Sequence, residues 1–218
     1  MIITNRDFVE WIKKKSSGGK LPDEIKLKSF EAGHQFMTQD KINQYIYVIN
    51  KGIVKCFLTE ENGRDYIVAF LGEGEIIGEL ELIRKIPNIC SVTALVETEV
   101  FQIGKTYFAQ CLENEKYLNQ IFLNDLASRL EQTVRRASYQ QIYPVEYTML
   151  KLLLLSRNQA IDISKKDLAD YLAIPVRSLN RAIQQLRSKK IIPEDQLLGI
   201  NISETEVKKI LQQFEEKI

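Results

Sequence analysis

The distribution of glycine divides this chain of 218 residues into two regions of different structure. Between Leu21 and Ile103, glycines 33, 52, 63, 72, 74 and 78 separate short apolar runs, and after Gly104 no glycine follows for more than ninety residues. Glycine marks tight turns and is unfavourable inside helices. We therefore expect short strands in the first region and helices in the second.

Five apolar runs of the first region predict strands. Glu61-Asn-Gly-Arg64 is a strong hairpin signal, and Asn50-Lys-Gly52 marks a further turn. Many short strands with such turns, and no long helix between them, are typical of a jelly-roll or barrel. A helix over Asn5–Lys15, with Phe8, Trp11 and Ile12 on one face, precedes them. The five runs are Tyr45–Ile49, Ile53–Leu58, Tyr66–Leu71, Cys90–Val96 and Val100–Ile103.

The second region predicts helices and one small wing. The longest helix covers Glu115–Gln141 and ends before Pro144. Ile191-Ile192 and Leu198–Ile202 are expected to be the two strands of a wing. The other expected helices are Lys105–Leu112, Pro144–Arg157, the two helices of the segment Ser164–Leu186, and Ser203–Ile218.

The longest helix has two apolar faces. Leu118 and Phe122 lie on one of them and are expected to cover the barrel. The other face is a candidate for a dimer interface with an identical helix. The alternative is a single helix buried within one subunit, and the pattern does not separate the two. The second face carries Leu123, Leu126, Leu130, Val134 and Ala137.

The segment Ser164–Leu186 predicts two helices joined by a tight corner. Ser164 and Asp167 form a capping-box pattern that starts the first helix. Pro175 suits the first position of the second helix because its φ is fixed and it has no N–H. Leu168, small Ala169 and Leu172 are expected to face inward on the first helix, and Val176, Leu179, Ala182, Ile183 and Leu186 on the second.

The outer face of the second helix carries side chains that suit DNA. Arginine pairs with guanine, asparagine or glutamine pairs with adenine, and serine bonds to backbone oxygens. Between Ser164 and Lys190 there are seven basic and two acidic residues, a local balance of +5 in a chain of net charge +1. Such a basic island indicates phosphate binding. The alternatives are a solvated helical corner or a module that binds another protein. The outward residues are Arg177, Arg181 and Gln184, flanked by Ser178, Asn180 and Gln185.

Composition argues against several other classes of protein. No apolar run reaches membrane-spanning length, and Cys56, Cys90 and Cys111 are odd in number and widely spaced, which favours packed thiols in a reducing cytoplasm. An enzyme on a similar barrel would need metal ligands or an acid–base pair. His34 is the only histidine and the glutamates look surface-exposed. We therefore expect no enzyme, no metal site and no resident cofactor.

A glycine-rich barrel, a long helix and a winged helix-turn-helix resemble, in this order and length, the cyclic-AMP receptor and fumarate–nitrate regulator family of bacterial transcription factors. Ile77-Gly-Glu-Leu-Glu-Leu82 and Leu168–Leu186 are the most specific matches. The resemblance implies an α+β fold with an antiparallel jelly-roll barrel over 1–113, a dimerisation helix over 114–141 and a winged helix-turn-helix over 142–218. The iron–sulfur branch is not supported because no N-terminal cysteine cluster is present.

The resemblance also suggests an effector pocket that departs from the family pattern. Gly78, Glu79 and Leu80 match the segment that holds the ribose of a cyclic nucleotide, and Thr133 falls where a purine can be contacted. The family's phosphate-binding Arg and Ser/Thr correspond to Asn88 and Ile89, which supply no cation. Glu73, Glu75, Glu79 and Glu81 add negative charge. We expect another small effector or none. The alternative is a cyclic nucleotide whose phosphate is bound by Arg84 or Lys85.

For DNA, the resemblance assigns base reading to the first half of the second helix, at Val176, Arg177, Ser178, Asn180 and Arg181, with Gln184 reaching the same groove. Lys165 and Lys166 are expected to bind the phosphate backbone. The implied partners are double-stranded DNA, a second copy of this chain and RNA polymerase.

Overall fold

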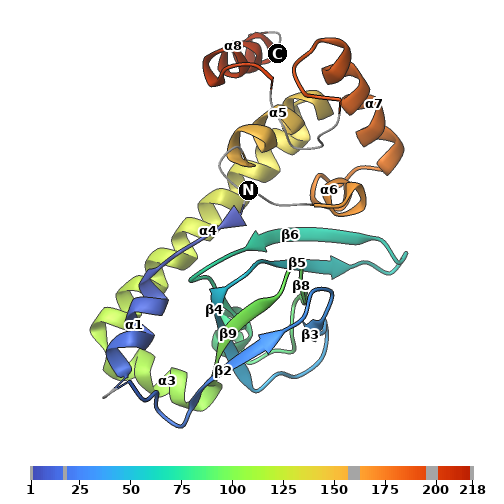
Figure 1. The fold of residues 1–218 in the computed structure, drawn as a ribbon. Helices are drawn as coiled ribbons and strands as arrows, with labels where there is room; N and C mark the ends of the chain where they lie inside the picture. Colours follow the sequence, from blue (N-terminus) through green and yellow to red (C-terminus); the bar gives the residue numbers. More distant parts are fainter. Residues whose placement is uncertain (1, 17–18, 157–162, 195–200, 217–218) are drawn as a thin grey trace. The chain divides into compact units, whose positions relative to one another are not determined.

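The computed structural model describes residues 2–16, 19–156, 163–194 and 201–216 of the chain (Figure 1). It divides into two compact units, Ile2–Leu130, here called the barrel unit, and Glu131–Ile218, the helical unit. The division falls inside the longest helix, α4 (Lys116–Ile142), whereas the sequence suggested boundaries at the ends of that helix. Each unit is described by itself.

Two sheets form the barrel unit, and all five predicted strands are confirmed. One sheet has the order β1-β6-β5-β8-β3 and the other β2-β9-β4-β7. Pairing is antiparallel, as expected, apart from the two-residue edge strand β1, which runs parallel to β6. The strands are β1 (Ile2–Ile3), β2 (Ile25–Phe30), β3 (Gln35–Met37), β4 (Tyr45–Lys51), β5 (Val54–Thr59), β6 (Asp65–Leu71), β7 (Ile76–Ile77), β8 (Ser91–Ala94) and β9 (Thr98–Gly104).

The two turn signals have different roles. Glu61–Arg64 closes the β5–β6 hairpin, in which Thr59 pairs with Asp65 and Gly63 adopts a φ of 75°. This confirms the hairpin. The turn at Asn50–Gly52 instead connects β4 and β5, which belong to different sheets. It therefore carries the chain from one layer of the barrel to the other.

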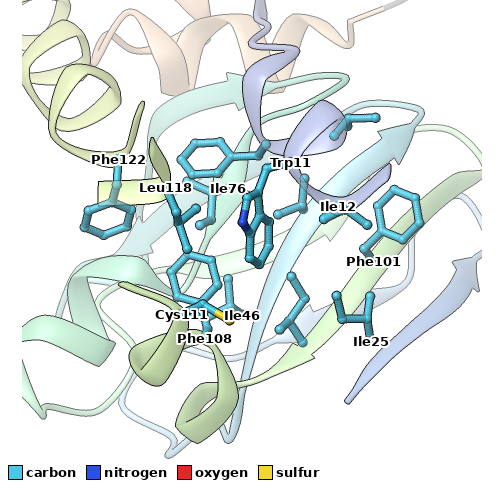
Figure 2. Close-up of a cluster of buried hydrophobic side chains, with 14 of the residues drawn as sticks. Trp11, Ile12, Ile25, Ile46, Ile76, Phe101, Phe108, Cys111, Leu118 and Phe122 are labelled. Atoms are coloured by element: carbon cyan, nitrogen blue, oxygen red, sulfur yellow. The ribbon is translucent and has the colours of Figure 1, made fainter. Parts of the chain in front are cut away.

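Helices cover one end of the barrel and complete its core. These are α1 (Asp7–Lys15), α2 (Glu79–Arg84), α3 (Lys105–Asn114) and the first half of α4. Figure 2 shows Trp11 surrounded by apolar side chains from the sheets and from the helices. Trp11 Nε1 donates to Glu115 Oε2 at 2.9 Å, which satisfies the polar atom of a ring that is otherwise buried. α1 and the first half of α4 are thus held on the barrel by one shared core.

The helical unit contains the second half of α4 together with α5 (Val145–Ser156), α6 (Lys165–Tyr171), α7 (Val176–Ser188) and α8 (Glu204–Glu215). Tyr147 on α5 stacks on Tyr143 with ring centroids 4.0 Å apart, and its hydroxyl donates to Glu215 on α8 at 2.7 Å. A capping box between Ser203 and Glu206 begins α8. The predicted helices over Pro144–Arg157 and Ser203–Ile218 are confirmed within one or two residues over their described parts.

The predicted wing is not present as a pair of strands in the residues described. Ile191 and Ile192 are buried but lie in no strand, and residues 198–200 of the second predicted strand lie outside the described residues. The Ile191 carbonyl accepts a hydrogen bond from Asn201 N–H at 2.9 Å. The apolar pair therefore serves the core of the helical unit, which explains why its sequence resembled a strand. None of the described helices is long and apolar enough to cross a membrane.

Candidate DNA interface and effector pocket

The helix-turn-helix begins at the predicted cap. Asp167 N–H donates to Ser164 Oγ at 3.0 Å, and the Ser164 hydroxyl donates in return to Asp167 Oδ2 at 2.8 Å. This contact stabilises the first turn of α6, because the first N–H groups of a helix have no partner within it. Leu168 and Ala169 are fully buried and Leu172 is nearly so, as the pattern predicted.

The corner between α6 and α7 uses an alanine in the left-handed region. Ala173 has a φ of 56°, and Ile174 N–H reaches back to the Ala169 carbonyl at 3.0 Å. Pro175 is the residue before the helix, with an extended ψ of 144°, so the prediction that it occupies the first helical position is off by one residue. Its carbonyl accepts from Ser178 N–H and Leu179 N–H at 2.9 and 3.2 Å, which starts α7.

One face of α7 is apolar and buried, and the opposite face is polar and exposed. Leu179, Ala182, Ile183 and Leu186 are buried. Val176 was also expected on this inner face, but it is 41% exposed because it lies in the first turn, beyond the edge of the core. An exposed Val176 agrees with the second expectation for this residue, that it lies on the base-reading surface. The exposed face consists of Arg177, Asn180, Arg181, Gln184 and Gln185, with Ser178 half-buried at its edge.

Positive charge on this surface is available for a partner. Arg177 and Arg181 are exposed, and in the described part of the chain neither guanidinium has an ion-pair partner within 4.0 Å. Lys165 and Lys166 are exposed at the start of α6, where Lys166 Nζ contacts Asp170 Oδ2 at 2.7 Å. Arg187 instead turns back, and its Nε donates to the Pro193 carbonyl at 3.1 Å. One arginine of the basic island, Arg187, is therefore used in an internal bond. The other basic residues on α7 and at the start of α6 are exposed.

The second half of α4 holds the helix-turn-helix at one point that the sequence analysis did not identify. The Arg136 guanidinium carbon lies 4.6 Å from the centroid of the Tyr171 ring at the end of α6. Gln140 Nε2 donates to the Tyr171 carbonyl at 3.1 Å. Arg136 and Tyr171 are both buried, so α6 is fixed to α4 by these side-chain contacts.

In the barrel unit, Gly78 and Glu79 begin α2 as the family pattern requires. Gly78 caps the helix with a φ of 92°, and a Cβ there would lie 3.1 Å from the Tyr45 carbonyl oxygen. Glu79, however, is buried, and its Oε1 accepts from Arg129 Nη1 at 2.8 Å. Leu80 is 42% exposed, and Arg84 and Lys85 are exposed at the other end of α2.

Asn88 and Ile89, which the resemblance aligned with phosphate-binding positions, both make internal hydrogen bonds. Asn88 is buried and its Nδ2 donates to the Thr38 carbonyl at 2.8 Å. Ile89 N–H donates to Glu81 Oε1 at 2.9 Å, so this N–H is already bonded to a carboxylate of the chain itself. These contacts bring Asn88, Ile89 and α2 together. Thr133 is exposed on α4 and belongs to the helical unit, so the structure does not assign it to this site.

Three of the four glutamates near α2 are buried, which corrects the expectation that they are surface-like. Only Glu73 is exposed. Arg129 compensates two of the buried ones, Glu75 and Glu79: besides the bond to Glu79, its Nη2 donates to Glu75 Oε2 and to the Ile76 carbonyl, both at 2.7 Å. Asp125 Oδ2 lies 3.1 Å from Arg129 Nε, within ion-pair distance but out of line for a hydrogen bond.

The sequence contained a signal from which the buried position of Arg129 could have been predicted. It lies seven residues after Phe122 and eleven after Leu118, on the face of α4 that was expected to cover the barrel. A charged residue on such a face requires a buried partner of opposite charge. We call Glu75, Glu79, Asp125 and Arg129 the Arg129 cluster.

The two apolar faces of α4 differ in burial as anticipated. Leu118 and Phe122 are buried in the core of the barrel unit. Leu123, Leu130 and Val134 are 59%, 66% and 58% exposed, and Ala137 is exposed as well. Leu126 is half-buried against the barrel core and therefore lies at the border between the two faces.

The three thiols are free, as expected for packed cysteines. Burial raises the pKa of Cys56 well above its ordinary value and that of Cys90 to about 12. A buried thiol that resists ionisation is a poor nucleophile and a poor metal ligand.

Known proteins resemble most of this chain. A cyclic nucleotide-binding domain model matches residues 27–115. The cyclic AMP receptor protein of Thermus thermophilus is 22% identical over 189 residues, which cover 80% of this chain and 86% of that protein. Over most of its length the chain is thus similar to proteins of the cyclic-AMP receptor and fumarate–nitrate regulator (CRP/FNR) type. Matches to further curated relatives span about half of their length, between 44% and 60%.

Solved structures support the same fold. FixK2 from Bradyrhizobium japonicum superposes with a TM-score of 0.73 at 17% identity, covering 87% of this chain and 96% of that one. A transcriptional regulator of the CRP/FNR family from Thermus thermophilus superposes with a TM-score of 0.72 at 15% identity, covering 87% and 100%. CRP/FNR relatives that match most of the chain are transcriptional regulators rather than enzymes.

Proposed function

We propose that this protein binds double-stranded DNA sequence-specifically through α7 and so regulates transcription in the cytoplasm. The observation that carries the proposal is the exposed face of α7, where Arg177 and Arg181 have no ion-pair partner in the described residues and alternate with Asn180 and Gln184. These side chains pair with base edges in the major groove and with phosphates. Lys165 and Lys166 anchor the DNA backbone beside them.

We propose a homodimer formed through α4. A leucine exposed by more than half of its surface is costly in a monomer, and Leu123, Leu130 and Val134 repeat at spacings of seven and four along one face. A second copy of the same helix would cover all of them. Two copies would place their α7 helices in successive major grooves, about 34 Å apart, on a pseudo-palindromic site. RNA polymerase is the partner through which a regulator bound there would act.

The proposed barrel function is response to an effector other than cyclic AMP, or activity without one. The support is that Glu79 is bonded to Arg129, while Asn88 and Ile89 N–H are bonded to Thr38 and Glu81. A cyclic phosphate would have to displace the Glu81 carboxylate without gaining a bidentate cation. Isothermal calorimetry with cyclic AMP and cyclic GMP is expected to show no micromolar binding. Such binding would overturn this part of the proposal and direct attention to Arg84 and Lys85.

The DNA proposal is tested by selection from a pool of random duplexes with the purified protein. We expect enrichment of a two-fold related sequence and an affinity that falls steeply as salt rises, because phosphate contacts release counterions. If the helical unit binds a protein instead, no sequence is enriched and duplex binding is absent at physiological salt.

A further inference from the structure

The Arg129 cluster contains more negative than positive charge. Three carboxylates surround one guanidinium, so the fully ionised cluster carries a formal charge of −2. All three acidic residues are buried, and a neutral donor, Asn5 Nδ2, contacts Asp125 Oδ1 at 3.2 Å. Excess charge of one sign out of water is unfavourable, and binding a proton is the simplest way to reduce it.

Glu75 has the geometry to take that proton. Its Oε2 accepts from Arg129, whereas its Oε1 is buried and has no hydrogen-bond partner among the residues that the structure describes. A proton bound to Oε1 would leave the hydrogen bond from Arg129 to Oε2 intact. It would also neutralise a carboxylate whose Oε1 is buried without a hydrogen-bond donor in the described residues. Gly74 fixes this position: its φ is 84°, and a Cβ there would lie 1.3 Å from the Asn5 carbonyl oxygen. The backbone before Glu75 therefore admits only glycine.

Charged groups reach the cluster from each neighbouring element. Glu75 lies between β6 and β7, Glu79 and Glu81 on α2, and Asp125 with Arg129 on α4. Burial raises the pKa of Glu75 to about 7; Arg129 opposes this rise, and Asp125 and Glu79 add to it. Glu79 interacts with Glu81 as well, and the Cys56 thiol on β5 is close enough to interact with Arg129. Lys105 on α3 interacts with Glu81. Glu75 and Glu79, whose pKa values are both raised chiefly by burial, therefore titrate as a coupled pair.

We propose that the Arg129 cluster is a proton-binding site with Glu75 as the acceptor, and that its occupancy sets how strongly α4 is held on the barrel. The effector that this barrel senses is then the hydrogen ion. Ionised Glu75 attracts Arg129, and protonated Glu75 leaves Glu79 and Asp125 as the charged partners. Because α4 continues from Arg129 into the helical unit, where Arg136 contacts Tyr171, a change in its anchoring is passed along one helix to the helix-turn-helix.

The chemical part of this proposal is tested without DNA. Infrared difference spectra of the full-length protein are recorded during a pH titration, and the carbonyl band of a protonated carboxylic acid is followed. We expect a band that persists above pH 6 and disappears with a midpoint of about 7. Glu75→Gln should abolish it. Glu73→Gln, the same change at an exposed carboxylate two residues earlier, should leave it. Absence of the band in the unmodified protein would overturn the proposal even if the variants failed to fold.

The regulatory part rests on the proposed DNA binding and uses the duplex selected there. Linkage predicts that affinity for this duplex changes roughly threefold or more between about pH 6 and pH 8 in the unmodified protein and in Glu73→Gln. In Glu75→Gln it should stay nearly constant. An equal pH dependence in all three proteins would overturn this coupling. Loss of duplex binding at every pH would instead count against the DNA-binding function, and the infrared titration would still decide the proton site.

Discussion

Arg181 lies in the second turn of α7 on its exposed face, where a guanidinium can reach a base edge. We predict that Arg181→Ala weakens binding to the selected duplex by roughly 1–3 kcal/mol, which is about 5- to 150-fold, and relaxes preference at one base pair. Competition gel shifts with single-base variants of the duplex measure both. Arg135→Ala is the control, because Arg135 is equally exposed on α4 but pairs with Glu131. Equal losses in the two variants would remove Arg181 from base reading.

Glu75 makes stability depend on pH in an unusual direction. Its pKa is raised from 4.5 to about 7, chiefly by burial, so the folded protein binds more protons than the unfolded chain between these values. Stability is therefore greatest at low pH within this window and falls as the pH rises towards 7, by on the order of 3 kcal/mol at most. Denaturation of the barrel unit, followed by fluorescence of its buried Trp11, should show this loss between pH 5 and 7.

The matching variant is Glu75→Gln, which keeps the shape of the side chain and cannot ionise. Its stability should vary much less over the same interval, whereas Glu73→Gln should behave like the unmodified protein. A slope of opposite sign, with stability gained as the pH rises, would mean that ionised Glu75 is the form favoured by folding.

At the scale of elements, the corner before α7 is strained at Ala173. An L-residue in the left-handed region costs about 1–2 kcal/mol, which glycine avoids, while glycine costs about 0.4–1 kcal/mol through the unfolded chain. We predict that Ala173→Gly stabilises the helical unit by about 0.5–1 kcal/mol. Calorimetry measures the change. Ala127→Gly, exposed within α4, should have the opposite effect because glycine weakens a helix. A destabilised Ala173→Gly variant would show that the corner is relaxed.

At the scale of the whole molecule, we predict that Leu130→Asp prevents dimer formation. It places a carboxylate in the centre of the exposed apolar face of α4, where two copies would otherwise meet. Sedimentation equilibrium should give a monomer over concentrations at which the unmodified protein is a dimer. Asn124→Asp is the control, since Asn124 is exposed about 100° around the helix from that face. An unchanged dimer in Leu130→Asp would place the interface elsewhere.

Local sequence patterns were sufficient to predict much of the fold of this protein. Four features could be predicted because each depends on spacing or turn chemistry within a few residues. They are the division into two regions by glycine content, the Glu61–Arg64 hairpin, the Ser164 cap and the inward residues of α6. Four strands, β1, β2, β3 and β7, and helix α2 were not predicted. β1 and β7 have two residues each, and β2 is mostly exposed, with Leu27 49% exposed. Such strands form because a neighbour pairs with them, and their own sequence carries little signal.

What the sequence determined by itself is the division into a strand region and a helical region, the separation of apolar and cationic faces along α7, and the lack of a cationic side chain at positions 88 and 89, which are Asn and Ile. Only the tertiary structure decided that Glu75, Glu79 and Asp125 share Arg129, that Glu81 bonds to Ile89 N–H, and that Tyr171 contacts Arg136. The physical reason is the distance along the chain over which each effect acts. Helix periodicity and capping depend on residues within one or two turns. A buried charge is stable only beside a partner that folding brings to it from elsewhere in the sequence.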